Sequence, residues 1–288
     1  MVVGWLSNAF QESKSDKVMM EMTSTTPLSV EAIRQYREDG YLIPECQLSA
    51  SRVAELMDAV DRVLVANPEV RPEKLVSVHI SGLNQEGVNG DDAFMDLAKD
   101  PLIVDCVEQL IGPDIILWGC QLFCKPGSDG MEVPMHQDGA YWPIRPLATC
   151  TVWVALDHVT EENGCMRIVP GSHRHQSLTH QKESREDIVL NQRVNDGRID
   201  PENTVSLELA PGQFSMHDVH LVHGSHPNRS GKRRAGLAIR YMPSTSLFKR
   251  DLIDTGTGSG YLVNFAKRPL WLIRGENKAG SDLKIGHT

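Results

Sequence analysis

Residues 115–124 read IILWGCQLFC, a run of apolar and aromatic residues that decides the fold. Further short runs rich in Val, Ile, Thr, Phe and Trp follow it, separated by Gly, Pro and Asn. Such runs between such breaks are typical of β-strands. We expect strands at 115–124, 150–156, 166–169, 204–209, 213–222 and 235–241. Many short, irregularly spaced strands after a helical region predict a mainly β fold, an antiparallel barrel or two-sheet jelly roll with helices packed outside it.

The part of the chain before these strands has the spacing of helices. Ser29 can accept a hydrogen bond from the first turn of a helix that ends by Gly40. Apolar residues recur at steps of three and four after Ser49 or Ser51 and stop near Pro68. We therefore expect helices over 29–40 and 49–68, two more at 92–99 and 101–111, and a short strand at 41–44.

No linker separates the helices from the strands, which predicts one domain. Its expected parts are a helical cap at 29–112, a jelly-roll core at 113–243 and a C-terminal extension at 244–288. Residues 1–28 lack periodicity and are expected to form a flexible tail. The glycine-rich segment GTGSG at 256–260 has no strand before it or helix after it, so we expect a plain loop.

The composition narrows the classes of function. The 288 residues carry 29 Lys and Arg against 38 Asp and Glu, and a net charge of −9 repels a nucleic acid backbone. No apolar run is long enough to span a membrane. The six cysteines are scattered without a CxxC pair, which predicts free thiols. Without a secretory leader at Met1, we expect a cytoplasmic protein that binds a small molecule, not nucleic acid or membrane.

Two histidines and a carboxylate form a candidate metal site. His136 and Asp138 follow a strand-like segment, and residues two apart on a strand project to the same face. A third ligand is expected from HDVHLVHGSH at 217–226, where His217 and His223 share parity on an uninterrupted strand. Periodicity does not choose between them. Such a set leaves coordination positions open for a cosubstrate and O2, which suits non-haem Fe(II), although zinc also accepts these ligands.

A candidate anion site accompanies the metal ligands. Arg234 lies eleven residues after His223 and opens the strand at 235–241. A guanidinium can grip a carboxylate through two parallel hydrogen bonds, and the hydroxyl of Ser225 can add a third. The alternative is a solvated basic turn, because Arg229, Lys232, Arg233 and Arg234 are close in sequence.

Three segments together resemble the phytanoyl-CoA dioxygenase family of Fe(II)- and 2-oxoglutarate-dependent oxygenases. They are HQDG at 136–139, ENGCMR leading to PGSH within 162–173, and HGS at 223–225 followed by Asn228 and Arg234. The likeness covers roughly residues 30–243 in order. It implies a double-stranded β-helix, a cupin-like jelly roll, which agrees with the predicted strands.

The resemblance also implies roles for single residues. It makes the metal ligands and catalytic residues His136, Asp138 and His223, with Fe(II), 2-oxoglutarate and O2 as cofactor and cosubstrates. It implies that Arg234 and Ser225 bind the distal carboxylate of 2-oxoglutarate, and that the walls of that pocket include Trp153 and Gln121. A carboxylate at position 138 favours hydroxylation, ring closure or desaturation, because related halogenating enzymes have a small residue there.

The prime substrate is predicted from the residues next to the ligands. The segment AYWPIR at 140–145 offers Tyr141 and Trp142 as an aromatic wall and Arg145 as a cation at the mouth, and His79 lies on an expected second wall. Ordinary packing of the aromatic residues is the alternative. We expect hydroxylation or oxidative cyclisation of a small glycosylated or polar natural product such as an antibiotic. The alternatives are a fatty acyl or CoA-type hydroxylase, which the acidic total disfavours, and a metal-binding cupin-like isomerase or sensor without 2-oxoglutarate turnover.

Overall fold

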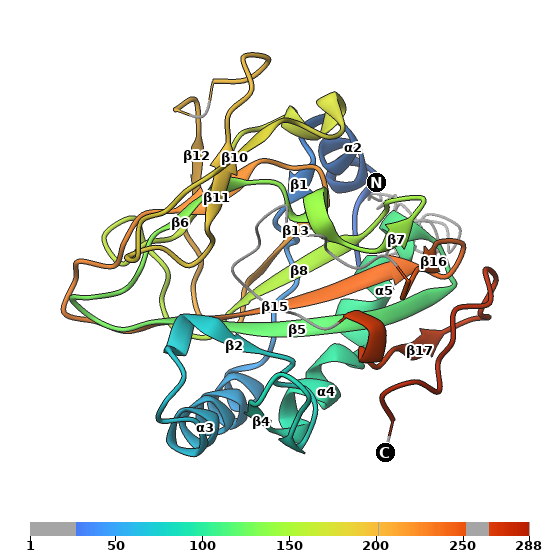
Figure 1. Ribbon diagram of the computed structural model, residues 1–288, viewed down its shortest axis with the longest axis horizontal. Helices are drawn as coiled ribbons and strands as arrows, with labels where there is room; N and C mark the ends of the chain where they lie inside the picture. The colour runs from blue at the N-terminus through green and yellow to red at the C-terminus, as the bar shows by residue number, and fades with distance from the viewer. Residues whose placement is uncertain (1–26, 201, 252–264, 288) are drawn as a thin grey trace, which may run out of the picture.

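The computed structural model describes residues 27–200, 202–251 and 265–287, and it has two antiparallel sheets (Figure 1). The major sheet contains β1 (Tyr41–Leu42), β2 (Leu75–Val76), β5 (Ile115–Lys125), β8 (Cys150–Ala155), β13 (Phe214–Asp218), β15 (Arg234–Pro243) and β17 (Trp271–Arg274). The minor sheet has the strand order β12 (Val205–Leu207), β9 (Met166–Ile168), β14 (His223–Ser225) and β6 (Val133–His136). The mainly β, jelly-roll prediction is therefore confirmed.

Three short strand pairs lie outside these two sheets. They are β3 (Gly82–Leu83) with β4 (Asn89–Gly90), β7 (Ile144–Arg145) with β16 (Leu247–Phe248), and β10 (His180–Lys182) with β11 (Gln192–Val194). Single 3-10 turns occur at η1 (Pro72–Lys74), η2 (Asp138–Tyr141), η3 (Ser172–His175) and η4 (Phe265–Lys267). The turn η2 begins directly after β6, and this places Asp138 beside the end of the minor sheet.

The helices begin and end where their capping residues predict. They are α2 (Val30–Asp39), α3 (Ala50–Ala66), α4 (Asp92–Ala98) and α5 (Pro101–Ile111). The hydroxyl of Ser29 accepts from the backbone N–H of Ala32, and the hydroxyl of Ser49 does the same for Arg52. Gly40 ends α2 in the left-handed region at φ 83°, which glycine adopts without strain.

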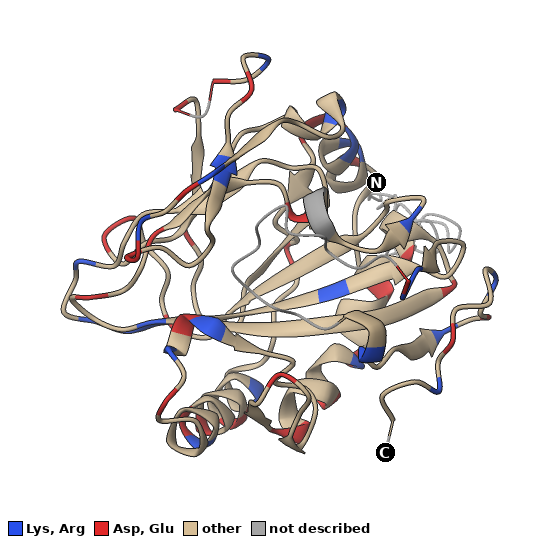
Figure 2. Cartoon of the chain, in the orientation of Figure 1, with Lys and Arg blue, Asp and Glu red and all other residues tan. Residues whose placement is uncertain are grey.

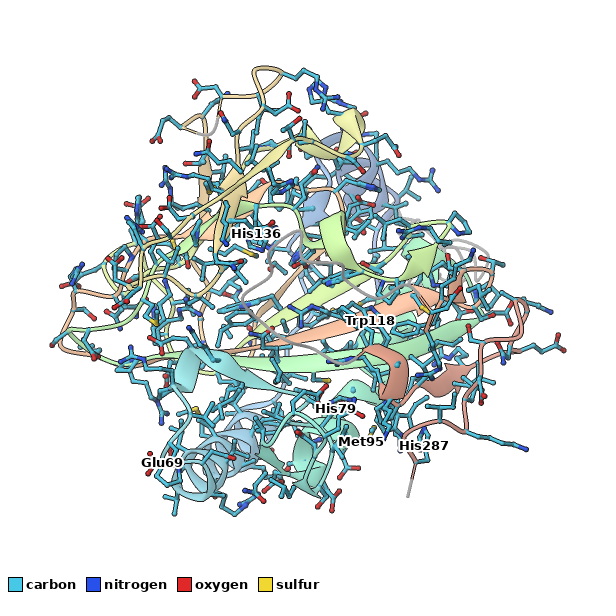
Figure 3. All side chains as sticks on the ribbon, viewed as in Figure 1. Glu69, His79, Met95, Trp118, His136 and His287 are labelled. Atoms are coloured by element: carbon cyan, nitrogen blue, oxygen red, sulfur yellow. The ribbon has the colours of Figure 1, made fainter. Side chains whose placement is uncertain are left out.

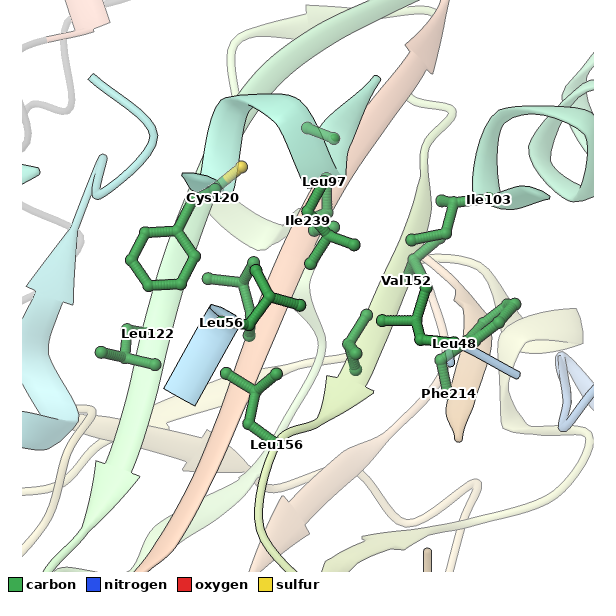
Figure 4. Close-up of a cluster of buried hydrophobic side chains, with 14 of the residues drawn as sticks. Leu48, Leu56, Leu97, Ile103, Cys120, Leu122, Val152, Leu156, Phe214 and Ile239 are labelled. Carbon is green, nitrogen blue, oxygen red and sulfur yellow. The ribbon is translucent and has the colours of Figure 1, made fainter. Parts of the chain in front are cut away.

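Alternation along the strands gives the major sheet two different faces. On β15, Leu237 and Ile239 point into the main hydrophobic core, which includes Leu56 of α3 and Leu97 of α4 (Figure 4). The helices α3 and α4 lie on this outer side, and the minor sheet lies on the other (Figure 1). The next residues in the alternation, exemplified by Ala238, face the space between the sheets. One period-two pattern thus builds both the core and the lining of a cavity.

The predicted single strand at 213–222 is wrong in its extent. β13 ends at Asp218, and β14 begins at His223 in the other sheet. Between them the chain turns, with the backbone N–H of Leu221 donating to the carbonyl of Asp218 at 3.0 Å. The segment therefore passes from one sheet to the other, and the parity rule for an uninterrupted strand does not apply across it.

The two ends of the domain also differ from expectation. Leu28, assigned to the tail by its sequence, is buried and its N–H donates to Gln109 Oε1 at 2.9 Å. Residues 1–26 and the GTGSG segment lie outside the described residues. In the C-terminal extension, Trp271 pairs with Leu117 and adds β17 to the edge of the major sheet. All six cysteines are free, as predicted. Within the described ranges, no helix has the length and apolar character needed to cross a membrane.

Candidate active site

A cavity of about 140 Å³ lies between the two sheets. Both sheets contribute side chains to it, and so do η2 and the C-terminal region. Of the residues predicted from the sequence, the cavity is lined by Gln121, His136, Asp138, Trp142, Trp153, His223, Ser225 and Arg234. Figure 2 shows that most charged residues lie on loops and helices and that few lie on the strands of the two sheets. The charged groups inside the cavity are therefore exceptions that need a physical explanation.

Three of the lining residues form a group that could hold a metal ion. One possible ligand atom from each of His136, Asp138 and His223 lies within 4.8 Å of the others, and all three side chains are buried. His136 and His223 are opposite each other in the register of β6 and β14, which brings their ring centroids to 4.3 Å. His136 Nε2 and Asp138 Oδ1 are 3.6 Å apart. Two imidazoles and one carboxylate on one side of a cavity leave the opposite side open for other ligands.

The two imidazoles are held in one orientation by the backbone. His136 Nδ1 lies 2.8 Å from the carbonyl of Pro134, and His223 Nδ1 lies 2.9 Å from the carbonyl of Leu221. A carbonyl accepts, so each Nδ1 carries the hydrogen and each Nε2 keeps its lone pair for a metal. Burial, followed by the neighbouring His136, holds the pKa of His223 well below its ordinary value, which keeps this ring neutral. Both rings are thus prepared as metal ligands.

Asp138 is placed between two histidines. Burial alone would raise its pKa, but the imidazoles of His136 and His217 beside its oxygens outweigh burial and hold the pKa well below the usual range. His217 Nε2 is 3.8 Å from Asp138 Oδ2, and the His217 and His223 ring centroids are 4.7 Å apart. The carboxylate is therefore ionised and ready to bind a cation.

His217 and His223 both face the cavity, although they lie on different sheets. The turn between β13 and β14 carries the chain across, and the inner faces of two opposed sheets look toward each other. The parity rule thus predicted correctly that both side chains face one space, but the reason is the two opposed sheets and not a single strand. Gln137 faces away, as its position between His136 and Asp138 predicts, and its amide nitrogen donates to the carbonyls of Gln176 and His220 at 2.7 and 2.6 Å.

Arg234 is a buried cation in the same cavity. It is 3% exposed, and it donates to the carbonyl of Gly164 at 3.0 Å and to that of Phe123 at 3.4 Å. Its Nε is buried without a partner, and no carboxylate of the described residues forms an ion pair with it. Burial lowers the pKa of Arg234 to about 10, so it stays charged at neutral pH. The solvated basic turn is excluded for Arg234, and a buried unpaired guanidinium calls for an anion.

Ser225 lines this end of the cavity, and Lys125 contacts Ser225. Lys125 is fully buried, and its Nζ donates to Ser225 Oγ at 2.8 Å and also to the carbonyl of His226. Because the Ser225 oxygen accepts from Lys125, the hydroxyl hydrogen is free to donate to a ligand. Burial, followed by the charge of Arg234, lowers the pKa of Lys125 well below its ordinary value. The sequence analysis did not identify Lys125 as a site residue. It lies opposite Arg234 in the pairing of β5 with β15, and this position becomes visible only once the two strands are known to pair.

Trp153 forms one wall beside Arg234. The guanidinium carbon of Arg234 lies 5.3 Å from the Trp153 ring centroid, close enough for a cation–π contact. The indole lies against Gly236 on the neighbouring strand, where a Cβ would come within 2.0 Å of the ring. The close approach of the indole therefore requires a glycine at position 236.

The residues predicted to contact the prime substrate are divided by the structure. Trp142 lines the cavity, whereas Arg145 is exposed and donates to the carbonyls of Trp142 and Ile144 at 2.9 and 2.7 Å. The side chain of Tyr141 lies outside the described part. His79, which Figure 3 labels, is buried and is not among the residues that line the cavity. Its ring packs edge-on against Trp271, with the ring centroids 4.8 Å apart. The expected second wall at His79 is therefore not part of the described cavity lining.

Sequence reasoning missed a second cationic region of the cavity. Arg240 and Arg268 line it together with Trp118, which Figure 3 labels on the sheet below His136. The signal for Arg240 is parity, because it is six residues after Arg234 on one strand. Arg268 gave no signal, since it comes from the C-terminal extension.

Comparisons with known proteins identify the family of the chain. The model of the family "Phytanoyl-CoA dioxygenase (PhyH)" matches residues 36–236. A probable alpha-ketoglutarate-dependent hypophosphite dioxygenase of Stutzerimonas stutzeri is 30% identical over 72% of this chain and 76% of its own length.

Two solved structures extend the likeness to the fold. The non-heme monooxygenase ThoJ superposes with a TM-score of 0.67 at 24% identity, covering 87% of this chain and 86% of its own. The alpha ketoglutarate-dependent carbocyclase SnoK from nogalamycin biosynthesis has a TM-score of 0.59 at 25% identity, covering 80% and 91%. The chain belongs to the phytanoyl-CoA dioxygenase family and is an iron- and 2-oxoglutarate-dependent dioxygenase.

Proposed function

We propose that His136, Asp138 and His223 hold Fe(II), and that Arg234 with Ser225 binds the distal carboxylate of 2-oxoglutarate. The observation that carries the assignment is the unpaired, buried Arg234 in the same cavity as the three ligands. A zinc isomerase or a metal sensor has no use for such a cation. An oxygenase needs it, because a dicarboxylic acid that chelates the metal at one end leaves its other carboxylate to be neutralised.

Each residue has a distinct task in this assignment. His136, Asp138 and His223 would hold the Fe(II), which with 2-oxoglutarate would supply the O2 activation needed to oxidise a C–H bond, with succinate and CO2 as the products of the cosubstrate. Arg234 and Ser225 fix the direction in which the cosubstrate lies, and Lys125 keeps the Ser225 hydroxyl turned toward it. Trp153 excludes water from the same end. The protein thus contributes the positioning of the reactants and the exclusion of water from the site.

The substrate is a small natural product that is hydroxylated or oxidatively cyclised. Asp138 occupies the third ligand position with a carboxylate, which supports these outcomes over halogenation. The similarity to a carbocyclase of antibiotic biosynthesis supports tailoring of a natural product. The cavity, with Trp118 and Trp142 in edge-to-face contact at 4.3 Å, supports a substrate with a flat apolar portion.

The assignment predicts a specific effect of Arg234→Gln on cosubstrate binding. We expect 2-oxoglutarate affinity to fall about 30-fold or more, because loss of a buried charge partner costs about 2 kcal/mol or more. Calorimetry with the Mn(II)-loaded protein measures affinity, and succinate formation with Fe(II), ascorbate and O2 measures turnover. Arg233→Gln is the matched control, because Arg233 pairs with Asp61 and Asp157 outside the cavity. Equal 2-oxoglutarate affinity in the wild type and Arg234→Gln would contradict the assignment.

A further inference from the structure

Arg240 gives the cavity a second cationic end. It follows Arg234 by six residues on β15 and faces the same side, so the two Cα atoms are about 20 Å apart along the strand. The two guanidinium groups also have different neighbours. Arg234 lies beside Trp153, whereas Arg240 lies 5.4 Å from the ring centroid of Trp142. Arg240 is therefore placed for a group other than the distal carboxylate of the cosubstrate.

Arg240 forms no ion pair with a carboxylate of the described residues, although its charge helps to lower the pKa of Asp138. Its Nη2 donates to the amide oxygen of Gln121 at 3.3 Å, and its Nε is buried without a partner. The neighbouring Arg268 differs, because it forms an ion pair with Glu86 at 2.7 Å in which both side chains are 6% exposed. Of these two cations, Arg240 alone faces the cavity without a carboxylate partner in the described part of the chain.

Two indole rings lie beside the guanidinium of Arg240. Trp118 and Trp142 meet at an interplanar angle of 67°, and the guanidinium lies 5.9 Å from the first ring centroid and 5.4 Å from the second. The indole N–H of Trp118 is buried and has no hydrogen-bond partner. This region therefore combines aromatic rings with two buried donors that lack a partner, the Nε of Arg240 and the indole N–H of Trp118.

The charges expected in the cavity with Fe(II) and 2-oxoglutarate bound also favour an anion beside Arg240. Fe(II) and Arg234 together contribute three positive charges, and 2-oxoglutarate with Asp138 contributes three negative charges. Arg268 is cancelled by Glu86. Of the guanidinium groups that line the cavity, that of Arg240 is then left without a negative partner, and its Nε is buried. An unpaired charge in such a place is costly, and an anionic substrate group would remove the cost.

We propose that Arg240, between Trp118 and Trp142, binds a carboxylate group of the prime substrate, which is a small acid with a flat ring. Arg240 is thus a specificity-determining residue, and it places the ring of the acid within reach of the metal ligands. The inference rests on the proposed function, because it assigns the other end of the cavity to 2-oxoglutarate.

The test compares an acid with its neutral partner. Phenylacetate and phenylacetamide are titrated by calorimetry into the anaerobic protein loaded with Fe(II) and 2-oxoglutarate. We expect the wild type to bind phenylacetate at least tenfold more tightly than phenylacetamide. Arg240→Gln should bring this ratio to about one, and Arg240→Lys should keep part of it. Arg52→Gln is the matched control, since Arg52 lies on α3 and pairs with Glu55.

The outcomes separate the two proposals. A wild type that binds 2-oxoglutarate but shows no preference for phenylacetate, or binds neither probe, overturns the role of Arg240 alone. A preference that persists in Arg240→Gln also overturns it, and so does loss of 2-oxoglutarate binding in that variant, because Arg240 would then belong to the cosubstrate site. A wild type that fails to bind 2-oxoglutarate overturns the proposed function instead. Unchanged 2-oxoglutarate affinity in Arg240→Gln shows that the variant is folded.

Discussion

Histidine residues of this protein show how burial and neighbours give one side chain different tasks. His136 and His223 have their Nδ1 atoms bonded to backbone carbonyls, which leaves each Nε2 for a metal. His217 lies in the same cavity, but neither of its ring nitrogens has a hydrogen-bond partner. The sequence could place all three near Asp138. It could not rank His217 and His223, because the difference lies in local backbone geometry and not in spacing.

His79 gives a prediction about stability and pH. Burial, followed by the charge of Arg268, lowers the pKa of His79 to about 3. The unfolded chain takes up a proton near pH 6.5 and the folded protein does not, so the free energy of unfolding falls as pH drops from about 6.5 toward 3. Well below pH 6.5 this contribution approaches about 1.4 kcal/mol per pH unit.

His79→Leu should remove that contribution. Urea unfolding of both proteins at pH 7, 6 and 5 measures it as the change in their stability difference with pH. The variant should gain on the wild type as pH falls, because other titrating groups are common to both. Parallel pH profiles would show that His79 takes up a proton in the folded state as easily as in the unfolded chain.

Among the strands and helices, β15 contributes side chains both to the hydrophobic core and to the cavity. Its two faces supply the core residues Leu237 and Ile239 and the cavity residues Arg234 and Arg240. Strand 235–241 was predicted from its apolar residues, and its first and last residues in the structure differ by only one or two positions. What the sequence could not reveal is which strands flank it, because pairing with β5 and β8 depends on the whole topology.

Helices and strands were predictable to different degrees for a physical reason. Capping residues act within one turn, so Ser29, Gly40 and Ser49 marked helix ends correctly. The turn between β13 and β14 has apolar residues such as Val219 and Val222, which are buried between sheets and resemble strand residues in sequence. The sequence did not predict β17, because this segment is a strand through its pairing with β5 at the sheet edge and has no strong apolar pattern of its own.

Gly236→Ala tests the packing of β15 against β8. The new Cβ would overlap the Trp153 indole, and overpacking of this kind costs about 1–3 kcal/mol. Because Trp153 lies over Arg234, 2-oxoglutarate affinity should fall as well. Chemical unfolding and calorimetry measure the two effects. Gly231→Ala is the matched control, because a Cβ there meets no atom within 4 Å.

Restoration gives the sharper version of this test. Gly236→Ala combined with Trp153→Leu should recover stability relative to Gly236→Ala alone, since the smaller side chain leaves room for the Cβ. It should not recover cosubstrate affinity, because the cation–π contact with Arg234 is lost. A double variant as unstable as the sum of the two single variants would point to a cause other than the clash.

For the whole molecule, the site joins strands that are far apart in the chain. The group that could hold a metal lies on β6, η2 and β14, and the proposed anion site lies mainly on β15 of the opposite sheet. Ligands that bind the folded state across two sheets must oppose unfolding of both. At a ligand concentration about 100 times Kd the stabilisation is about 2.7 kcal/mol, which raises the Tm of a domain this size by roughly 5 °C or more.

Mn(II) and 2-oxoglutarate should therefore raise the Tm more together than either does alone, because the metal supplies the second attachment of the cosubstrate. Differential scanning fluorimetry of the wild type and His136→Ala measures this. His136→Ala should lose the effect of the metal and most of the joint effect. An equal joint rise in both proteins would mean that His136 is not part of the metal site.

The shared strand β15 has a consequence for how the range of accepted compounds can change. Arg234 and Arg240 are held at a fixed interval by a strand that pairs with β5 along its length and with β8 from Gly236 to Tyr241, so mutations cannot shift one residue relative to the other without breaking these pairings. Ala238, between them, is the adjustable point. A larger side chain at position 238 would leave room only for shorter acids. We therefore expect related proteins to change their substrate range through the size of this side chain, while the distance between Arg234 and Arg240 stays constant.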